Sequence, residues 1–405
     1  MIVLSDWSFM HPHRIIAKLK KEGGYFNRQK MTLLGADRGD MTAADRAMFA
    51  RMRMDPTDIL DVTAATYTYL INGHGPGENW TGLFNPGERV RLRIINAAAM
   101  TIFNIRIPGL DMQVVSADGQ NVMPVTVHEL QIGNAETYDV IVQPKDDRAY
   151  TFVAESMDRS GTGRATLAPR MGMTAAVPPL RKRPTLTMRD MGMTGMDHGS
   201  MSGIDHGAAA APMAAMDHGD MNMRDKSKVP NVKVGVGVDM IAPMPIDRTG
   251  EPGLGLENVG HKVLVYRDLM SLTPNPDKRP PTRGVEVHLT GNMERFMWSI
   301  DGEKFSENPE PIRFERNERV RVTMINDSMM THPMHLHGHF FEVVNGHTGS
   351  HPMKHTVMVM PGGKVAFDLT ADAPGDWAFH CHLLLHMHAG MMRVVTVRPL
   401  DGDAA

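Results

Sequence analysis

An internal repeat constrains the fold of this chain more than any other feature of its sequence. The stretch GERVRLRIIN at 87–96 matches NERVRVTMIN at 317–326, at an offset of 230 residues. Further along, AYTFVAES at 149–156 resembles DWAFHCHL at 376–383. Self-similarity at a nearly constant offset is the signature of a repeated structural unit. The chain is therefore predicted to contain two copies of one domain.

Both copies are predicted to consist mainly of β-strands. Short apolar or alternating runs bounded by Gly, Pro, Asn and Asp predict strands at 89–96, 138–144, 285–292 and 319–326. A Thr followed by apolar residues at helical spacing predicts one helix at 42–54. We therefore expect an all-β fold made of two Greek-key β-sandwich domains.

The two domains are expected to span residues 1–178 and 230–405, with a linker at 179–229. Within the linker, residues 188–223 hold nine Met and three Asp-His-Gly repeats, with no aromatic residue and Ile204 as the one branched aliphatic. Such a segment cannot bury enough apolar area to offset the entropy lost on ordering it. It is predicted to be largely disordered and flexible.

Composition excludes several classes of partner. The chain has 405 residues and a net charge of -3, and it has no long Lys/Arg run, so nucleic acid is not an expected partner. No apolar stretch is long enough to span a membrane. The single cysteine, Cys381, excludes an intrachain disulfide. The 37 Met and 20 His residues are soft to borderline ligands, which suit copper better than magnesium or calcium.

Two dense motifs in the second copy carry the metal chemistry. The first is HPMHLHGH at 332–339, which contains His332, His335 and His337. The second is His380-Cys381-His382, which His386 and Met391 follow. Side chains alternate between the two faces of a strand, so Cys381 points one way and both neighbouring histidines point the other. Cys381 can therefore bind one copper while His380 and His382 face a separate copper cluster.

One set of ligands matches a blue-copper electron-transfer site. Such a site has two imidazoles, a thiolate and a weak axial thioether. Here His332 and His386 supply the imidazoles, Cys381 supplies the thiolate, and Met391 supplies the thioether, with Met392 as its rival. Gly390 is expected to let the backbone turn closely beside the metal.

The first copy is predicted to be free of copper. At the offset of 230 residues, His332, His335 and His337 correspond to Ile102, Ile105 and Ile107. The residues that correspond to His380, Cys381 and His382 are Val153, Ala154 and Glu155. These side chains are apolar or otherwise unsuited to copper, so the first domain is expected to act as a scaffold.

The chain resembles the copper-resistance branch of the multicopper oxidases, enzymes with three cupredoxin domains. The resemblance covers NWTGLFNPGERVRLRIINAAAMT, the Met-rich linker, LTGNMERFMWSIDGEKF, MMTHPMHLHGH and HCHLLLHMHAGMM. It implies that both sandwiches are cupredoxin-like. It also implies that His335 is a type 2 copper ligand and that His337, His380 and His382 are type 3 ligands, while His332 belongs to the blue (type 1) copper.

The resemblance also implies ligands that this sequence does not contain. The family carries HxHG and HxHSH motifs on its first domain, and neither occurs here. We expect the sequence to begin where the family's second domain begins, with a complete type 1 site and half of the type 2 and type 3 ligands. A missing first domain or a partner subunit would supply the rest. The opening residues, MIVLSDWSFM, show no signal peptide, and a periplasmic location is implied by the resemblance alone.

The activity implied by the resemblance is oxidation of Cu(I), and of phenols through an exposed edge of the blue site, coupled to reduction of dioxygen to water. Cys381, His380 and His382 would carry the electrons, and Asp327 is a candidate acid or base, although a turn Asp is an equal interpretation.

An alternative is a copper-binding protein that does not turn over oxygen, with linker Met and His side chains that sequester Cu(I). That linker has an equally simple interpretation as a low-complexity segment without a site. A two-domain oxidase with a cluster between subunits is disfavoured by Ile105 and Ile107.

Overall fold

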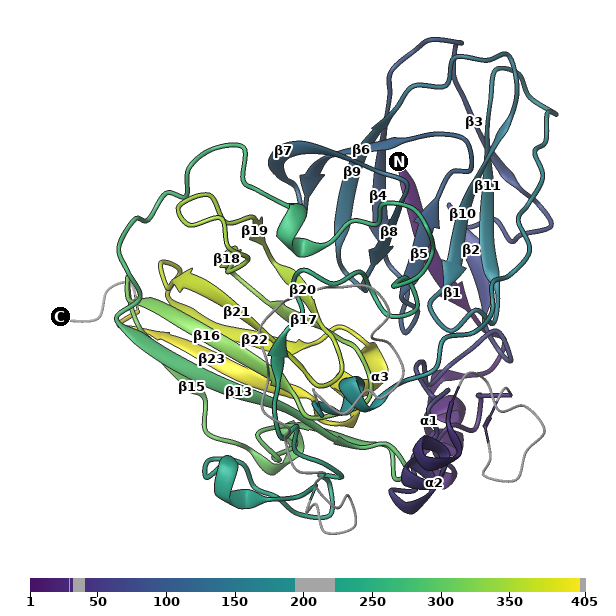
Figure 1. Cartoon of the computed structure of the whole chain (residues 1–405). Helices are drawn as coiled ribbons and strands as arrows, with labels where there is room; N and C mark the ends of the chain where they lie inside the picture. Colours follow the sequence, from purple (N-terminus) through teal and green to yellow (C-terminus); the bar gives the residue numbers. More distant parts are fainter. Residues whose placement is uncertain (29, 32–40, 194–222, 401–405) are drawn as a thin grey trace, which may run out of the picture.

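Each half of the chain folds into a pair of β-sheets, and the two pairs lie side by side (Figure 1). The structure is a computed structural model that describes residues 1–28, 30–31, 41–193 and 223–400. None of the helices in this part of the chain is long and apolar enough to cross a membrane.

The first sandwich contains a six-stranded and a five-stranded sheet. The six-stranded sheet has the order β2 (Thr68–Ile71), β1 (Ile2–Trp7), β4 (Val90–Asn96), β9 (Thr137–Val142), β6 (Met112–Ala117) and β7 (Gln120–Val127). The five-stranded sheet has the order β3 (Trp80–Leu83), β11 (Thr162–Ala168), β10 (Tyr150–Ser156), β5 (Phe103–Arg106) and β8 (Glu129–Ile132).

The second sandwich repeats this arrangement. Its larger sheet has the order β14 (Met297–Ile300), β13 (Arg283–Asn292), β16 (Arg319–Asn326), β21 (Gly363–Thr370), β18 (Phe341–Val343) and β19 (Met353–Lys354), with β12 (Ile246–Asp247) paired to β21. Its smaller sheet has the order β15 (Ile312–Glu315), β23 (Met392–Arg398), β22 (Gly375–Cys381), β17 (His332–Leu336) and β20 (Thr356–Val359). Every strand of the first sandwich has a counterpart at the same place, which confirms the predicted all-β repeat.

The strand registers correct one detail of that repeat. Cys381 pairs with Met334 in the second sandwich, and Ala154 pairs with Ile105 in the first. Ile105 therefore corresponds to Met334, and the predicted match of Ile105 with His335 is wrong by one residue. The reason is a loop of different length. The side-chain amide of Asn96 donates a hydrogen bond to the carbonyl of Thr101, five residues later. The equivalent Asn326 donates to the carbonyl of Met330, only four residues later.

The corrected register leaves the conclusion about the first copy unchanged. His332 now corresponds to Phe103 and His335 to Arg106, in place of Ile102 and Ile105. Neither replacement is a copper ligand of the kind that the second copy carries. The first sandwich contributes packing and charge.

Three α-helices are described: α1 (Pro12–Lys21), α2 (Ala43–Arg51) and α3 (Leu384–Ala389). The predicted helix at 42–54 is confirmed as α2, and the Thr42 side chain accepts a hydrogen bond from the Asp45 amide in a capping box. Sequence reasoning missed α1, although Pro12 at its first position was a usable signal. The third helix is short and carries His386, so it belongs to the predicted site.

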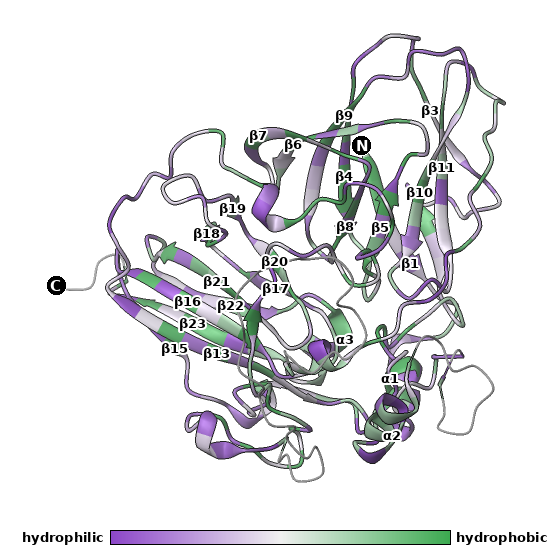
Figure 2. Cartoon of the chain, in the orientation of Figure 1, coloured by the Kyte–Doolittle hydropathy of each residue, from purple (hydrophilic) through white to green (hydrophobic). Residues whose placement is uncertain are grey.

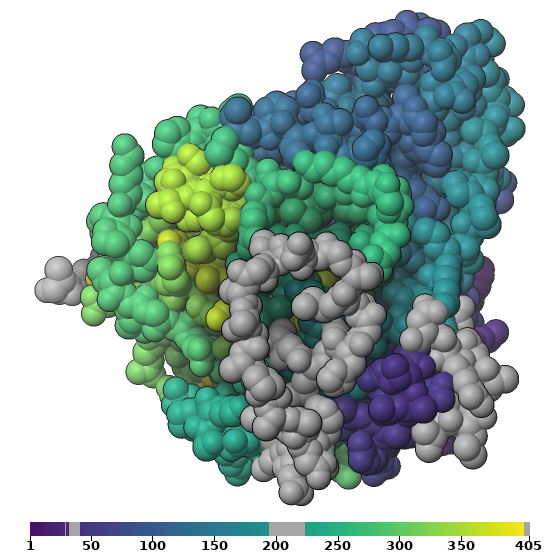
Figure 3. Space-filling model, in the orientation of Figure 1, coloured from purple at the N-terminus to yellow at the C-terminus, as the bar shows by residue number. Residues whose placement is uncertain are grey.

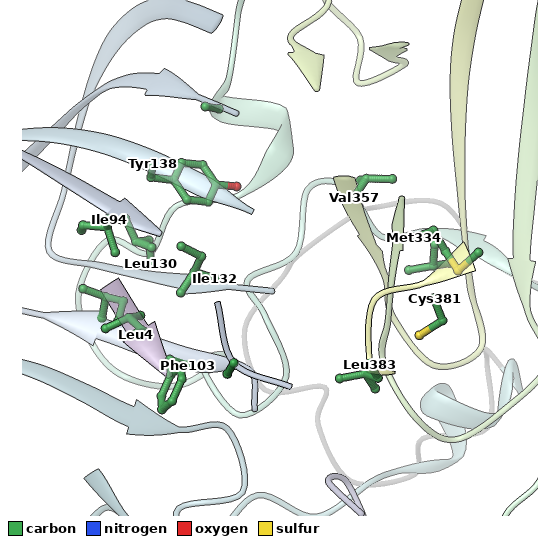
Figure 4. Packing of buried hydrophobic residues seen from close by; sticks show 14 of the residues in the cluster. Leu4, Ile94, Phe103, Leu130, Ile132, Tyr138, Met334, Val357, Cys381 and Leu383 are labelled. Atoms are coloured by element: carbon green, nitrogen blue, oxygen red, sulfur yellow. The ribbon is translucent and has the colours of Figure 1, made fainter. Parts of the chain in front are cut away.

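The apolar residues concentrate in the strands, where they form the interior of both sandwiches (Figure 2). One close view shows Leu4, Ile94 and Phe103 in the first sandwich, and Met334 and Cys381 in the second (Figure 4). Cys381 lies beside Met334 among buried apolar side chains, and it is fully buried itself. The thiol is thus part of the core of the second domain.

The segment before β13 joins the two sandwiches. Its strand β12 pairs with β21, while Val263 and Ser271 make isolated β-bridges to Glu129 and Val122 of the first sandwich. In Figure 3 the green stretch of this segment lies across the junction between the blue and the yellow-green halves. Of the predicted linker, residues 194–222 lie outside the described residues.

Candidate metal centre

Three predicted ligands converge inside the second sandwich. His332 begins β17, Cys381 ends β22, and His386 lies on α3. The Sγ atom of Cys381 lies 3.6 Å from Nδ1 of His332 and 3.8 Å from Nδ1 of His386, and the two Nδ1 atoms are 3.3 Å apart. Among the described residues this is the one group of His, Cys, Asp and Glu side chains whose ligand atoms lie close enough to share a metal.

These separations fit a metal ion bound in the plane of the three atoms. With bonds of about 2.0 Å to nitrogen and about 2.3 Å to sulfur, a trigonal site would separate the nitrogens by about 3.5 Å and nitrogen from sulfur by about 3.7 Å. Each observed separation agrees with these values to about 0.2 Å. The donor set, two imidazoles and a thiolate, is the set that blue copper requires.

The far nitrogen of each imidazole has its own partner. Nε2 of His332 lies 2.7 Å from Oγ of Ser328, whose hydroxyl also contacts Oδ1 of Asn326 at 2.8 Å. Nε2 of His386 lies 2.6 Å from Oδ2 of Asp61. When the Ser328 hydroxyl donates to Asn326, it accepts from His332. Both rings then carry their proton on Nε2 and present a free Nδ1 lone pair toward Cys381.

Aromatic rings enclose the site. The indole of Trp298 stacks on His386 at 3.9 Å between ring centres, and it meets His332 edge-on at 5.2 Å. The ring centre of Phe296 lies 6.0 Å from the ring centre of His386. His386 is fully buried, so the prediction of an exposed edge at the blue site is wrong for the residues that the structure describes.

Burial determines the protonation of the three groups. It lowers the pKa of both His332 and His386 well below the usual value, so both imidazoles are neutral and ready to bind a metal. Burial raises the pKa of the Cys381 thiol. The thiolate therefore forms when a metal displaces the proton, which couples metal binding to proton release.

Two methionines follow, and only Met391 lies on the side of the thiol. Met391 is fully buried, and its carbonyl accepts the amide of Cys381 at 3.1 Å. Met392 is half-buried and pairs with His380 in the β22–β23 ladder, so it shares the face of His380. The register favours Met391 over Met392 as the axial ligand.

Four further predicted histidines lie together on the other face of these strands. Nε2 of His337 lies 3.1 Å from Nε2 of His380. The ring centre of His335 lies 4.7 Å from the ring centre of His337 and 5.8 Å from that of His382. The rings of His380 and His382 lie 5.4 Å apart. Cys381 therefore stands between the two groups, as the alternation of side chains predicted.

Burial keeps three of these histidines, His335, His380 and His382, in the neutral form that can bind a metal. Burial lowers the pKa of His335 to about 3 and that of His382 to about 4, and it also lowers the pKa of His380. Nδ1 of His382 is buried and has no hydrogen-bond partner in the described part of the chain. An imidazole nitrogen left in this way fits a position that a metal would occupy.

Asp327 has buried hydrogen-bond partners that the sequence did not predict. Its Oδ1 accepts the amide of Ala242 at 2.8 Å, and its Oδ2 lies 2.6 Å from Nδ1 of His288. Burial opposes a charge on His288, but the hydrogen bond and the charge of Asp327 raise its pKa to about 9. Asp327 thus forms a buried ion pair with His288. Its role as an acid or base stays a prediction.

Sequence reasoning missed the residues that hold the ligands. Asp61 and Ser328 stand in no motif, and Asp61 lies 325 positions from His386 in the sequence. It also missed a buried cluster of thioethers beside Ile59 and Leu60, the residues that precede Asp61. The methionines in this methionine cluster are Met157, Met188, Met191, Met193, Met240, Met329, Met358 and Met360, with Met41, Met48, Met52, Met54, Met223 and Met293 partly buried around them.

Comparison with known proteins identifies the family. Residues 1–177 and 278–401 each match a family described as multicopper oxidase. The chain is 48% identical to a copper resistance protein A homolog of Pseudomonas syringae pv. tomato, over 98% of this chain and 70% of the relative. It is also 48% identical to copper resistance protein A of Escherichia coli, over 98% of this chain and 71% of the relative.

The chain belongs to the copper resistance protein A family of multicopper oxidases. Its cofactor is therefore copper, and its class is that of oxidoreductases that use dioxygen and a reducing substrate.

Solved structures of multicopper oxidases share the fold of this family member. Fet3p, a multicopper oxidase that functions in iron import, aligns with a TM-score of 0.57 at 15% identity, over 98% of this chain and 65% of the other. Laccase from Botrytis aclada aligns with a TM-score of 0.56 at 16% identity, over 98% of this chain and 63% of the other. The chain thus spans about two thirds of the length of these oxidases.

Proposed function

We propose that the chain oxidises Cu(I) through a blue-copper site and passes the electrons toward a cluster where dioxygen is reduced to water. The observation that carries the proposal is the position of Cys381 between a three-atom metal site and four clustered histidines. When bound, copper supplies one-electron transfer at the first site and the reduction of dioxygen at the second. In this proposal His332, Cys381, His386 and Met391 hold the blue copper.

Cys381 provides the connection between the two sites. Its thiol faces His332 and His386, while its neighbours His380 and His382 face the other cluster. Only backbone and side-chain bonds separate the sulfur from the two imidazoles. In the proposal His335 holds a type 2 copper, and His337, His380 and His382 hold type 3 copper. The remaining ligands would come from a domain or subunit that bears the family's other histidine motifs.

The surroundings of His386 favour a small cationic substrate over a phenol. The ring is covered by Trp298, Phe296 and Asp61, so a bulky aromatic reductant has no direct contact with it in the described part of the chain. Asp61 supplies a carboxylate at the far nitrogen of the ligand. The methionine cluster includes Ile59 and Leu60, the two residues that precede Asp61 in the chain, and thioethers are the ligands that Cu(I) prefers. A periplasmic location agrees with such a substrate and forms part of the proposal.

The test compares the chain with a Cys381→Ser variant, after both have been loaded with copper. The difference in bound copper isolates the blue site, because any copper on other Met and His side chains is common to both. We expect a difference of about one copper and an intense blue absorption in the parent alone. With a domain or subunit that bears the remaining ligands present, we also expect oxygen uptake driven by Cu(I) faster than uptake driven by a phenol.

Other outcomes would select other functions. A copper difference of about one with a blue band, and no oxygen uptake even when the remaining ligands are supplied, would indicate a copper-binding, electron-transfer protein. Equal copper in both proteins, with no blue band in the parent, would contradict the assignment of the ligands.

A further inference from the structure

A buried ion-pair cluster joins the two sandwiches behind the strand that carries His335. Lys354 lies on β19, and its side chain is fully buried. Its Nζ lies 3.1 Å from Oδ2 of Asp118 and 3.2 Å from Oε1 of Glu136, both of them buried carboxylates of the first sandwich. Burial of such charges costs several kcal/mol for each ion, and apolar residues of similar volume often stabilise a fold at least as well. A contribution to stability is therefore a weak explanation for this cluster.

Asp118 also holds the backbone next to Lys354. Its Oδ2 accepts the amides of His355 and Thr356, each at 3.2 Å. Its Oδ1 accepts the amide of Thr137 in its own sandwich at 2.9 Å. One carboxylate thus ties the segment of residues 354–356 to the first domain through two amides and an ammonium group.

The same segment holds the ring of His335. Nδ1 of His335 lies 2.7 Å from the carbonyl oxygen of His355 and 3.2 Å from Oγ1 of Thr356. Thr356 is also the residue opposite His335 in the β17–β20 ladder. A carbonyl oxygen only accepts, so Nδ1 carries the proton and donates it. Nε2 keeps its lone pair, which is the nitrogen left to bind a metal.

We propose that Asp118, assisted by Lys354, is a positioning residue for His335: it locks the 354–356 segment so that the ring keeps its Nδ1–H tautomer and its orientation. The inference rests on the proposed function, in which His335 is a copper ligand. It gives the copper-free sandwich a role in the chemistry of its neighbour, because Asp118 belongs to the first domain and His335 to the second. Partners that orient a metal-binding histidine in this way commonly change metal affinity 10- to 100-fold.

The first test needs no metal. The metal-free full chain, with histidine labelled by nitrogen-15, is compared with the Asp118→Asn variant by NMR, and a His335→Asn variant assigns the signal. An asparagine offers one acceptor oxygen in place of two, so it cannot hold Thr137 and the 354–356 segment together. We expect the parent to show the Nδ1–H tautomer alone and the variant to show a mixture. Glu136→Gln is the matched control, because Glu136 contacts Lys354 but not His355 or Thr356, and it should keep the parent tautomer.

The second test uses Cu(II) as the probe, with electron paramagnetic resonance to follow copper on the histidine cluster and blue absorption to follow the Cys381 site. Asp118→Asn should weaken Cu(II) binding at the cluster about tenfold and leave the blue absorption unchanged. If the single variant does not fold, Asp118→Glu takes its place, because it keeps a carboxylate beside Lys354 while its longer side chain moves the oxygens away from the amides of Thr137, His355 and Thr356.

Two results would overturn the inference. One is an unchanged His335 tautomer in a folded Asp118 variant. The other is an equal loss of both copper signals, which would show a general packing role. A parent chain without blue absorption would refute the proposed function only, because the tautomer is measured without metal.

Discussion

Cys381 contacts one nitrogen of each of two imidazoles, and the other nitrogen of each imidazole contacts a side chain of a different kind. His332 is held by the hydroxyl of Ser328, and His386 by the carboxylate of Asp61. The two ligands are thus alike in chemistry and differ in the partner of the far nitrogen.

The axial position can be tested with two adjacent residues. Met391→Leu should keep the blue copper and raise its reduction potential, because a site with one donor fewer favours the less charged Cu(I). Met392→Leu should leave the potential unchanged, since Met392 shares the face of His380. The measurement is a redox titration of the blue absorption. A shift in the Met392 variant alone would assign the axial ligand to that residue.

At the scale of the element, the turn from α3 into β23 brings His386 and Met391 to the same site. The amides of Gly390 and Met391 both bond to the carbonyl of His386, at 3.1 and 3.0 Å. Gly390 has φ of +132°, and a Cβ there would lie 2.8 Å from the carbonyl oxygen of Trp298 and 2.7 Å from Cβ of Lys304. The backbone approaches this closely only because the residue is glycine.

Gly390→Ala should therefore damage the site as well as the fold. We expect a loss of about 3 kcal/mol in the free energy of unfolding and a weaker blue absorption, because strain and a clash displace His386 and Met391. Gly346→Ala is the matched control, since Gly346 also has a positive φ, +102°, but has no atom within 4 Å of the added Cβ. It should cost about 1 kcal/mol and leave the blue absorption intact. Urea unfolding and the visible spectrum measure both effects, and equal effects in the two variants would contradict the close approach.

At the scale of the whole molecule, the two sandwiches share one interior. A single cluster of buried apolar residues contains Leu4 and Ile94 of the first domain together with Met334 and Cys381 of the second. The ion pairs of Lys354 cross the same boundary. An interior that is continuous across two domains makes them unfold together.

Calorimetry tests this coupling. We expect one unfolding transition for the metal-free chain and one transition at higher temperature for the copper-loaded chain. Copper at 100 times its dissociation constant should add about 2.7 kcal/mol, because it binds the folded state alone. The copper-loaded Cys381→Ser variant is the control and should show a smaller shift. Two transitions, of which copper moves only one, would mean that the domains unfold independently.

The fold class could be predicted from the sequence alone, and so could the positions of the candidate ligands. The repeat predicts two like sandwiches, and the His-Cys-His motif with His332, His386 and Met391 predicts where a blue copper would lie. These features are local: alternation along one strand decides which face a side chain takes, and ligand spacing along the chain is visible in the sequence.

The surroundings of those ligands became visible in the folded structure alone. The contact of Asp61 with His386, the burial of that histidine and the tie between Asp118 and the 354–356 segment all join residues far apart in the chain. Even the match between the repeats needed the strand registers, because one extra residue in a loop is invisible to a constant offset. The physical reason is the same in each case: such contacts depend on how two sandwiches pack, and packing leaves no spacing or period in the sequence by which it could be found.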